Sequence, residues 1–146
     1  MPSLLLAILV VTVQARTEDH YPHVNAVYEV TLQNTGKTEQ IVDLTSISVN
    51  DATFSSPGGG LAGSGSVASD EFWSDRMCIN SNGFAVIKPG AAATVLVKIE
   101  TPEIAPGLVK LTVGLSFWRI TNLVLCRAER IEVKPSVTVR VEPARR

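Results

Sequence analysis

The sequence predicts a mainly-β protein: an immunoglobulin-like antiparallel β-sandwich that follows an apolar N-terminal segment. Three observations support this fold class. From residue 24 onward, apolar residues recur at every second position, which is the period of a half-buried strand. Turn sequences separate these stretches at roughly 8–12-residue spacing. Hardly any stretch has the helical period, and a βαβ fold would need helices between its strands.

The first expected strand runs over Val24–Gln33, with apolar residues on one face and mostly polar residues on the other. A turn follows at Asn34–Lys37, because Asn and Gly tolerate a positive φ. In the next strand the parity of the apolar residues changes between Leu44 and Ile47. This change predicts a bulge near Thr45–Ser46, or a strand that crosses from one sheet to the other.

The later apolar stretches are short and are separated by turns rich in proline and glycine. They lie at Phe84–Val86, Ala93–Ile99, Val109–Phe117, Leu123–Cys126, Ile131–Val133 and Val137–Val141. Together with the first two strands they give seven or eight strands, as in a sandwich. Phe117 and Trp118 have opposite parity, so one of these two rings is expected to face away from the core.

Ser55–Asp70 is rich in Gly and Ser and predicts a long surface loop. Within it, Gly58–Gly63 matches the G-x-G-x-x-G spacing of dinucleotide-binding loops. That motif binds pyrophosphate at the N-terminus of a helix in a βαβ unit, and no helix is expected to begin here. We therefore interpret the segment as a flexible, surface-exposed and variable region.

Composition and motifs argue against several classes of function. The net charge of −1 and the 18% of charged residues provide no basic surface for nucleic acid. His20 and His23 are the only histidines, so a Ser-His-Asp or Cys-His arrangement would have to use one of them. With Glu18 and Asp19 they could bind a metal, but a defined site needs further ligands, and we favour a polar linker. We predict no enzyme activity, no catalytic or metal site, no cofactor and no small-molecule substrate.

Cys78 and Cys126 are the only cysteines. Neither has another Cys or a His at the spacing of metal ligands. They could form one disulfide or remain two buried thiols, and we favour the disulfide for a protein outside the cytoplasm. Closing a loop of this length would stabilise the fold by about 4 kcal/mol in the chain-entropy model.

The first fifteen residues, MPSLLLAILVVTVQA, pose the main question about function. Leu4–Val13 is apolar apart from Thr12, and as a helix it would span about 15 Å, half of a hydrocarbon core. Val13-Gln14-Ala15 resembles a signal-peptide cleavage site, but no Lys or Arg precedes Arg16, so the basic start of a signal peptide is missing. Three interpretations remain: a retained assembly segment, which we favour, a removed secretory signal, and an ordinary core strand.

A retained apolar segment can join subunits. Burying its side chains stabilises a contact by about 25 cal/mol per Å², either as a helix among sister helices or as a strand on a neighbour's sheet edge. Such a head-to-tail contact does not close, so it generates fibres. Removing residues 1–15 should then leave a folded monomer. The residues expected to carry polymerisation are Leu4, Leu5, Leu6, Ile8, Leu9, Val10, Val11 and Val13.

This interpretation divides the chain into an assembly segment at residues 1–15, a linker at 16–23 and a sandwich at 24–146. Three segments follow one another in the chain: the apolar start, AVYEVTLQNTGKTEQIVDLTSISVND and IKPGAAATVLVKIE. This order resembles the β-sandwich heads of archaeal surface filament subunits, the type IV-like pilins and archaellins. The likeness extends over about residues 1–125. The chain lacks a basic-Gly prepilin cleavage site, and its apolar segment is short. These departures leave room for a truncated start, or for the archaeal class in which a donated strand links subunits.

The resemblance implies an extracellular, cell-surface homopolymer whose partner is the chain itself, together with a surface or cell adhesion target. The alternative is a secreted or membrane-tethered β-sandwich module that binds a protein or a glycan.

Overall fold

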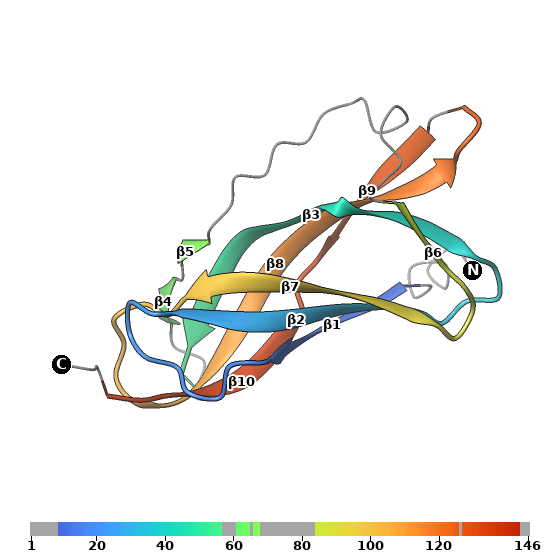
Figure 1. Cartoon of the computed structure of the whole chain (residues 1–146). Coiled ribbons are helices and arrows are strands. Elements are labelled where there is room, and N and C mark those ends of the chain that lie inside the picture. The colour runs from blue at the N-terminus through green and yellow to red at the C-terminus, as the bar shows by residue number, and fades with distance from the viewer. Residues whose placement is uncertain (1–8, 57–60, 65, 68–83, 126, 144–146) are drawn as a thin grey trace.

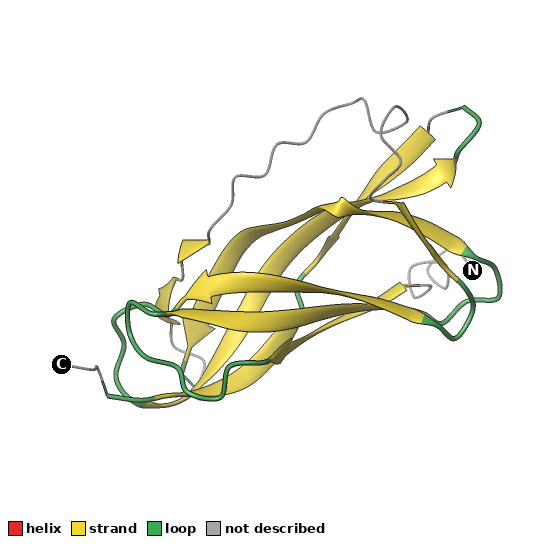
Figure 2. Cartoon of the chain, viewed as in Figure 1, coloured by secondary structure: helices red, strands yellow, loops and turns green. Residues whose placement is uncertain are grey.

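The computed structural model describes residues 9–56, 61–64, 66–67, 84–125 and 127–143 (Figure 1). Among these residues it contains ten strands, arranged in two antiparallel sheets, and no helix (Figure 2). The prediction of a mainly-β, immunoglobulin-like antiparallel sandwich is therefore confirmed.

Two layers form the sandwich. Sheet A contains, in spatial order, β1 (Leu9–Ala15), β2 (Asn25–Asn34), β7 (Ala92–Glu100) and β5 (Ser66–Val67). Sheet B contains β10 (Ser136–Val141), β8 (Gly107–Asn122), β3 (Gln40–Ser55) and β4 (Leu61–Ser64), with β6 (Phe84–Ile87) paired to β3 and β9 (Arg127–Val133) paired to β8.

The two longest strands, β3 and β8, have 16 residues each and form the centre of sheet B. They pair from Ile41 opposite Ile120 to Ser55 opposite Lys110. Because both are longer than their other neighbours, each shares its outer edge between two short strands: β10 and β9 on β8, and β4 and β6 on β3. The β8–β9 hairpin consequently runs past the body of the sandwich (Figure 1).

The core lies between the two sheets and follows the alternation read from the sequence. Its largest buried side chains are Tyr28 from β2, Phe54 from β3 and Phe117 from β8. Trp118 is half-buried and does not belong to this core, so the expected separation of Phe117 and Trp118 onto opposite faces is confirmed. Period-two burial of this kind places about half of each strand's side chains in the core.

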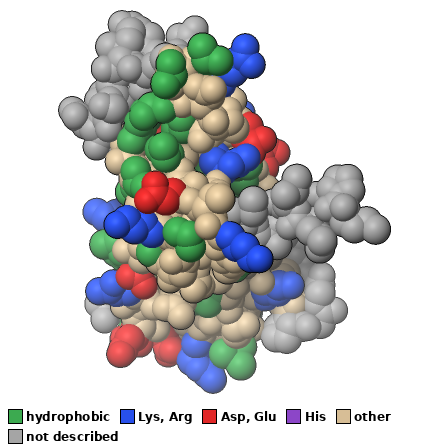
Figure 3. Space-filling model, turned by 90° about the vertical axis from the view of Figure 1, so that its right-hand side faces the viewer, with side chains coloured by type: hydrophobic (Ala, Val, Ile, Leu, Met, Phe, Trp, Pro, Cys, Tyr) green, Lys and Arg blue, Asp and Glu red, His purple; other side chains and the backbone are tan. Residues whose placement is uncertain are grey.

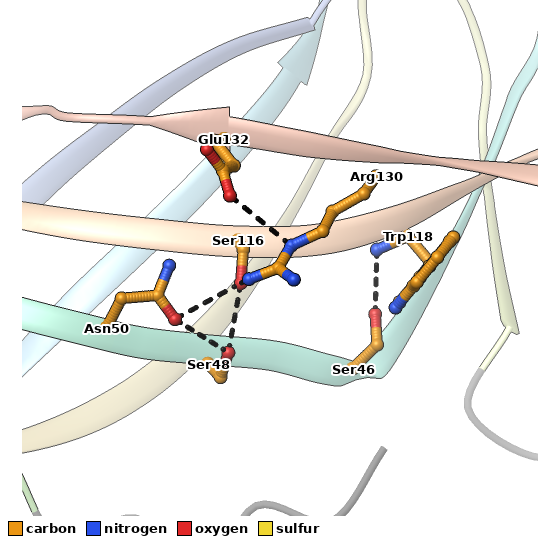
Figure 4. A network of polar contacts seen from close by, with 7 residues as sticks. All are labelled: Ser46, Ser48, Asn50, Ser116, Trp118, Arg130 and Glu132. Atoms are coloured by element: carbon orange, nitrogen blue, oxygen red, sulfur yellow. Dashed lines mark hydrogen bonds and ion pairs between the residues drawn. The ribbon is translucent and has the colours of Figure 1, made fainter. Parts of the chain in front are cut away.

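The predicted bulge is present in β3. Register with β8 shifts between Asp43 and Ser48, where the parity of the apolar residues changes. The hydroxyl of Ser46 donates to the carbonyl oxygen of Asp43 at 2.6 Å. It also accepts from the backbone N–H of Trp118 at 2.9 Å (Figure 4). A side-chain oxygen thus takes the place of a missing ladder acceptor, as buried N–H groups require.

The expectation of a loop throughout Ser55–Asp70 is wrong in part. Ser55 still belongs to β3, β4 pairs with the end of β3, and β5 pairs with β7 opposite Ile99 and Glu100. Strand edges carry backbone N–H and C=O groups that need hydrogen-bond partners. A Gly- and Ser-rich segment can supply these partners, because backbone pairing needs no side chain.

The expectation of a strand at Leu123–Cys126 is also wrong. Leu123–Leu125 form the turn between β8 and β9. The side-chain oxygen of Asn122 accepts the backbone N–H of Leu125 at 2.9 Å, an Asx-type contact that closes a turn. An apolar run therefore lies at an exposed turn.

Candidate functional site

The apolar N-terminal segment continues into β1, a strand of the sandwich itself. β1 pairs antiparallel with β2, from Leu9 opposite Asn34 to Ala15 opposite Tyr28. It is the first strand in the spatial order of sheet A, and β2 is its sheet partner among the described residues. Its other edge has no strand partner in the described part of the chain.

The side chains of β1 alternate between the core and the outer face of sheet A. Val13 is 4% exposed, and Leu9, Val11 and Ala15 pack against the same core. Val10, Thr12 and Gln14 are exposed. Of the residues expected to carry polymerisation, Leu9, Val11 and Val13 therefore fill this chain's own core, Val10 lies on the outer face, and Leu4, Leu5, Leu6 and Ile8 lie outside the described residues.

The sandwich consequently begins at β1 and not at residue 24. For Leu9–Ala15 the structure has the ordinary core strand, the third of the interpretations drawn from the sequence. Among the described residues, no helix has the length and apolar character to cross a membrane.

Residues 16–24 connect β1 to β2 and are held by backbone hydrogen bonds. The N–H groups of Arg16 and Thr17 donate to the carbonyl oxygen of Val27 at 2.8 and 3.2 Å. The N–H of Val27 donates to the Thr17 hydroxyl at 2.9 Å. The N–H of Glu142 donates to the carbonyl oxygen of His20 at 2.7 Å. This linker, residues 16–24, therefore contacts both sheets.

His20 is 2% exposed, and its ring packs against the ring of Tyr28 with centroids 5.6 Å apart. Neither ring nitrogen of His20 has a hydrogen-bond partner among the described residues, nor does the Tyr28 hydroxyl. Burial lowers the pKa of His20 below its ordinary 6.5, and the carbonyls of Glu18 and Arg140 with the Asp19 carboxylate offset part of this effect. Burial also raises the pKa of Tyr28. Burial therefore favours the neutral form of the His20 imidazole in the folded protein.

Acidification is expected to destabilise the fold through His20. The folded state holds the imidazole neutral, whereas the unfolded chain protonates it near pH 6.5, so the unfolded state binds more protons as the pH falls below that value. The free energy of unfolding should then fall by at most about 1.4 kcal/mol per pH unit, down to the lowered pKa of the folded state. Urea unfolding of the wild type and of His20→Phe between pH 7.5 and 4.5 measures this term. A parallel pH dependence in the two proteins would refute it.

His20 is buried and His23 is exposed, so the two histidines do not form one metal-binding cluster. His23 is exposed, and its ring nitrogens lie 2.8 Å from the carboxylate of Glu103 and 3.6 Å from that of Glu100. His20 is buried instead. Among the described residues, no group of three or more His, Cys, Asp or Glu side chains could hold a metal ion.

A polar network crosses sheet B beside the bulge (Figure 4). Ser116 hydrogen-bonds Ser48 at 3.1 Å and Asn50 at 3.4 Å, and it accepts from Arg130 at 3.3 Å. Arg130 also pairs with Glu132 at 3.4 Å. Within the network the carboxylate of Glu132 contacts Arg130, whereas the hydrogen-bond partners of Ser116 are Ser48, Asn50 and Arg130. The network fixes the register of β3, β8 and β9.

Cys78 and Cys126 lie outside the described residues. The disulfide between them stays a prediction.

No protein-family model and no curated protein matches this chain. Similar solved structures are the native conformation of E. coli alpha-2-macroglobulin (12% identity, TM-score 0.48) and the sporulation control protein Spo0M from Bacillus subtilis (14%, 0.45). The CARDB domain of the PF1109 protein from Pyrococcus furiosus, in complex with di-metal ions, has 13% identity and a TM-score of 0.38.

The alignments cover 93%, 95% and 92% of this chain, and 7%, 50% and 87% of the respective other chains. This chain therefore spans a small part of the macroglobulin and half of Spo0M. With TM-scores below 0.5, these likenesses carry no argument about function. The resemblance to archaeal filament subunits stays a prediction.

Proposed function

We propose that this chain is a structural subunit of an extracellular, cell-surface filament in which β1 joins neighbouring subunits. In the filament, β1 of one copy pairs with β2 of the next and fills its core. One observation supports this above all: β1 is the first strand of the described chain, lies at the edge of sheet A, and pairs along one side.

Exchange of β1 costs little in contacts. A donated strand can repeat the register of Leu9 with Asn34 and of Ala15 with Tyr28, and it places Val13 in the same core position. The cost lies in opening the linker, residues 16–24, which is held by backbone hydrogen bonds to Val27, Thr101 and Glu142. Exchange of an identical element between copies is a low-cost route to assembly.

The proposed contact is head-to-tail, because each copy gives a strand at one place and receives one at another. Such a contact continues without closing unless the rotation between copies returns to the start. The apolar side chains of Leu4, Leu5, Leu6 and Ile8 then have a place between subunits, where burial removes them from water. This is the role that the sequence predicts for them.

Locking β1 onto its own β2 tests the proposal. Thr12 and Thr31 are opposite each other in the β1–β2 register, and antiparallel partners lie at Cα separations that a disulfide spans. Monomeric Thr12→Cys/Thr31→Cys protein, oxidised when dilute, should form no filaments on concentration, and adding reductant should restore them. Negative-stain electron microscopy provides the measurement.

The matched control locks two strands that stay together in the proposal. Thr31 is also opposite Thr94 of β7, so oxidised Thr31→Cys/Thr94→Cys protein should assemble like the wild type. Filaments from the oxidised Thr12/Thr31 variant, or none from the wild type at any concentration, would overturn strand exchange.

A further inference from the structure

The turn between β8 and β9 exposes three consecutive apolar side chains. Leu123, Val124 and Leu125 are 52%, 92% and 59% exposed, and we call these residues the tip. The last β8–β3 pair joins Ile120 to Ile41, so the tip lies beyond the end of β3. It is convex and projects from the body of the sandwich (Figure 1). Contiguous apolar surface of this kind marks a contact site.

The charges of the hairpin itself are largely neutralised. Arg119 pairs with Glu129, and Arg130 pairs with Glu132. Arg127, the first residue of β9, has no anionic partner among the described residues. The hairpin therefore presents three apolar side chains and one uncompensated cation.

Two further turns lie at the same end of the sandwich as the tip. They are the β2–β3 turn at residues 35–39 and the β6–β7 turn at residues 88–91. Asn34 joins them, since its N–H donates to Ala91 and its carbonyl accepts from Gly90. They carry Lys37, Lys88 and Glu39, so these two turns and Arg127 of β9 give the described part of this end three cations and one carboxylate. Figure 3 faces this end and has hydrophobic side chains gathered toward its top, where the hairpin lies.

In the described part of the chain, the opposite end carries mainly carboxylates. It contains the linker (residues 16–24), the β7–β8 turn (residues 101–106) and the residues after β10. Among the described residues of this end, the carboxylates are Glu18, Asp19, Glu103 and Glu142, and Arg16 pairs with Glu29 at 3.0 Å. The described charges therefore favour an approach of the tip end, over the opposite end, to an anionic surface.

The path of the chain agrees with this orientation. Leu9, where β1 begins, is opposite Asn34, so the chain enters the sandwich at the tip end. The sequence immediately before Leu9, Leu4–Ile8, is apolar.

We propose that the tip end docks on an anionic lipid bilayer, with Leu123, Val124 and Leu125 inserted among the headgroups and acyl chains and with Lys37, Lys88 and Arg127 near the lipid phosphates. A convex apolar tip with cations spread over separate turns suits a deformable, charged interface, whereas a protein partner would need a matching concave pocket. Apolar insertion plus attraction to anionic lipid is the ordinary combination for binding at an interface. The inference does not depend on strand exchange, because the tip belongs to sheet B.

Vesicle flotation of the full-length protein tests the proposal. Vesicles of phosphatidylcholine with about 30% phosphatidylglycerol have an anionic surface, and the wild type should float with them. With vesicles of phosphatidylcholine alone, the floating fraction should be several-fold smaller. Leu123→Ser/Val124→Ser/Leu125→Ser should lower the partition coefficient at least tenfold, since each exposed side chain contributes when buried. Lys37→Gln/Lys88→Gln/Arg127→Gln should remove the preference for the anionic vesicles.

Matched controls exclude general effects of surface substitution. Leu96 is 61% exposed on the outer face of sheet A, so Leu96→Ser should bind like the wild type, as should Lys98→Gln. Equal flotation of the wild type and the tip variant would overturn the proposal. So would loss of flotation only on replacing Leu4–Leu6 by serine, which would assign insertion to the N-terminal segment. A wild-type dimer that the tip variant loses, without flotation, would assign the tip to a contact between copies.

Discussion

Removal of residues 1–15 is expected to cost the sandwich a large part of its stability. The deletion takes away β1, and with it the buried Val13 and the partly buried Leu9, Val11 and Ala15. Burying one Val or Leu side chain contributes about 1.5–3 kcal/mol, so the loss is on the order of 5 kcal/mol, comparable with a small domain's whole stability. Thermal unfolding followed by circular dichroism should report a Tm lower by about 10–20 °C, or no cooperative transition.

The same deletion provides a test by complementation. A synthetic peptide of residues 9–17 should bind the truncated protein and raise its Tm in proportion to the logarithm of peptide concentration, as linkage requires. The matched control is the same peptide with Val13→Asp, which should have no effect. If the truncated protein were as stable as the full chain, β1 would not contribute to the stability of the sandwich. That result would agree with the folded monomer expected from the sequence alone.

Val13→Asp is expected to destabilise the protein by about 3–5 kcal/mol, because it places a carboxylate without a partner in the core. Thr12→Asp, one residue earlier on the exposed face of β1, should change stability by about 0.5 kcal/mol or less. The pair separates burial from a general effect of charge in this segment. Urea unfolding at pH 7.5 measures both differences.

Equal and small effects of these two substitutions would contradict the placement of β1 in the core. Equal and large effects would contradict its alternation between a buried and an exposed face. The two effects must differ, since Val13 is buried and Thr12 is exposed on alternate positions of β1.

Much of the sandwich was predictable from the sequence because its strands alternate strictly. In β2, β7, β8 and β10 the apolar residues recur at every second position of the sequence, and Gly or Pro precedes β7, β8 and β10. The bulge in β3 was also predictable, because a parity change within a continuous strand requires an extra residue. These features depend on local sequence, which is why one sequence was sufficient.

The position of β1 could not be derived in the same way. In Leu9-Val10-Val11-Thr12-Val13 four of five residues are apolar, so the run is as consistent with a helix or a signal sequence as with a strand. What decides is the open edge of β2, a tertiary feature. Val10 on the outer face hides the alternation that Thr12 and Gln14 would otherwise reveal.

The tip was misinterpreted for a related reason. Leu123–Leu125 is apolar and β-prone, and local hydrophobicity alone predicts a buried strand. The signal that could have identified a turn is Asn122, whose side chain caps the backbone N–H of Leu125. The burial of His20 had no local signal, because it depends on ring packing against Tyr28 and on the bridge to Val141 of β10, which are tertiary contacts.

Isotope mixing tests most directly whether β1 is shared between copies. Thr12→Cys/Thr31→Cys protein is prepared with ¹⁴N and with ¹⁵N, mixed in equal amounts as reduced monomers, assembled and then oxidised. Trypsin cleavage after Arg16 and Lys37 places the two cysteines in separate peptides, residues 1–16 and 17–37. Mass spectrometry of the disulfide-linked pair then gives the origin of each strand. Strand exchange predicts that half of the linked pairs combine ¹⁴N with ¹⁵N, whereas linked pairs of one isotope only would show that β1 stays in its own chain and would contradict the proposed joint.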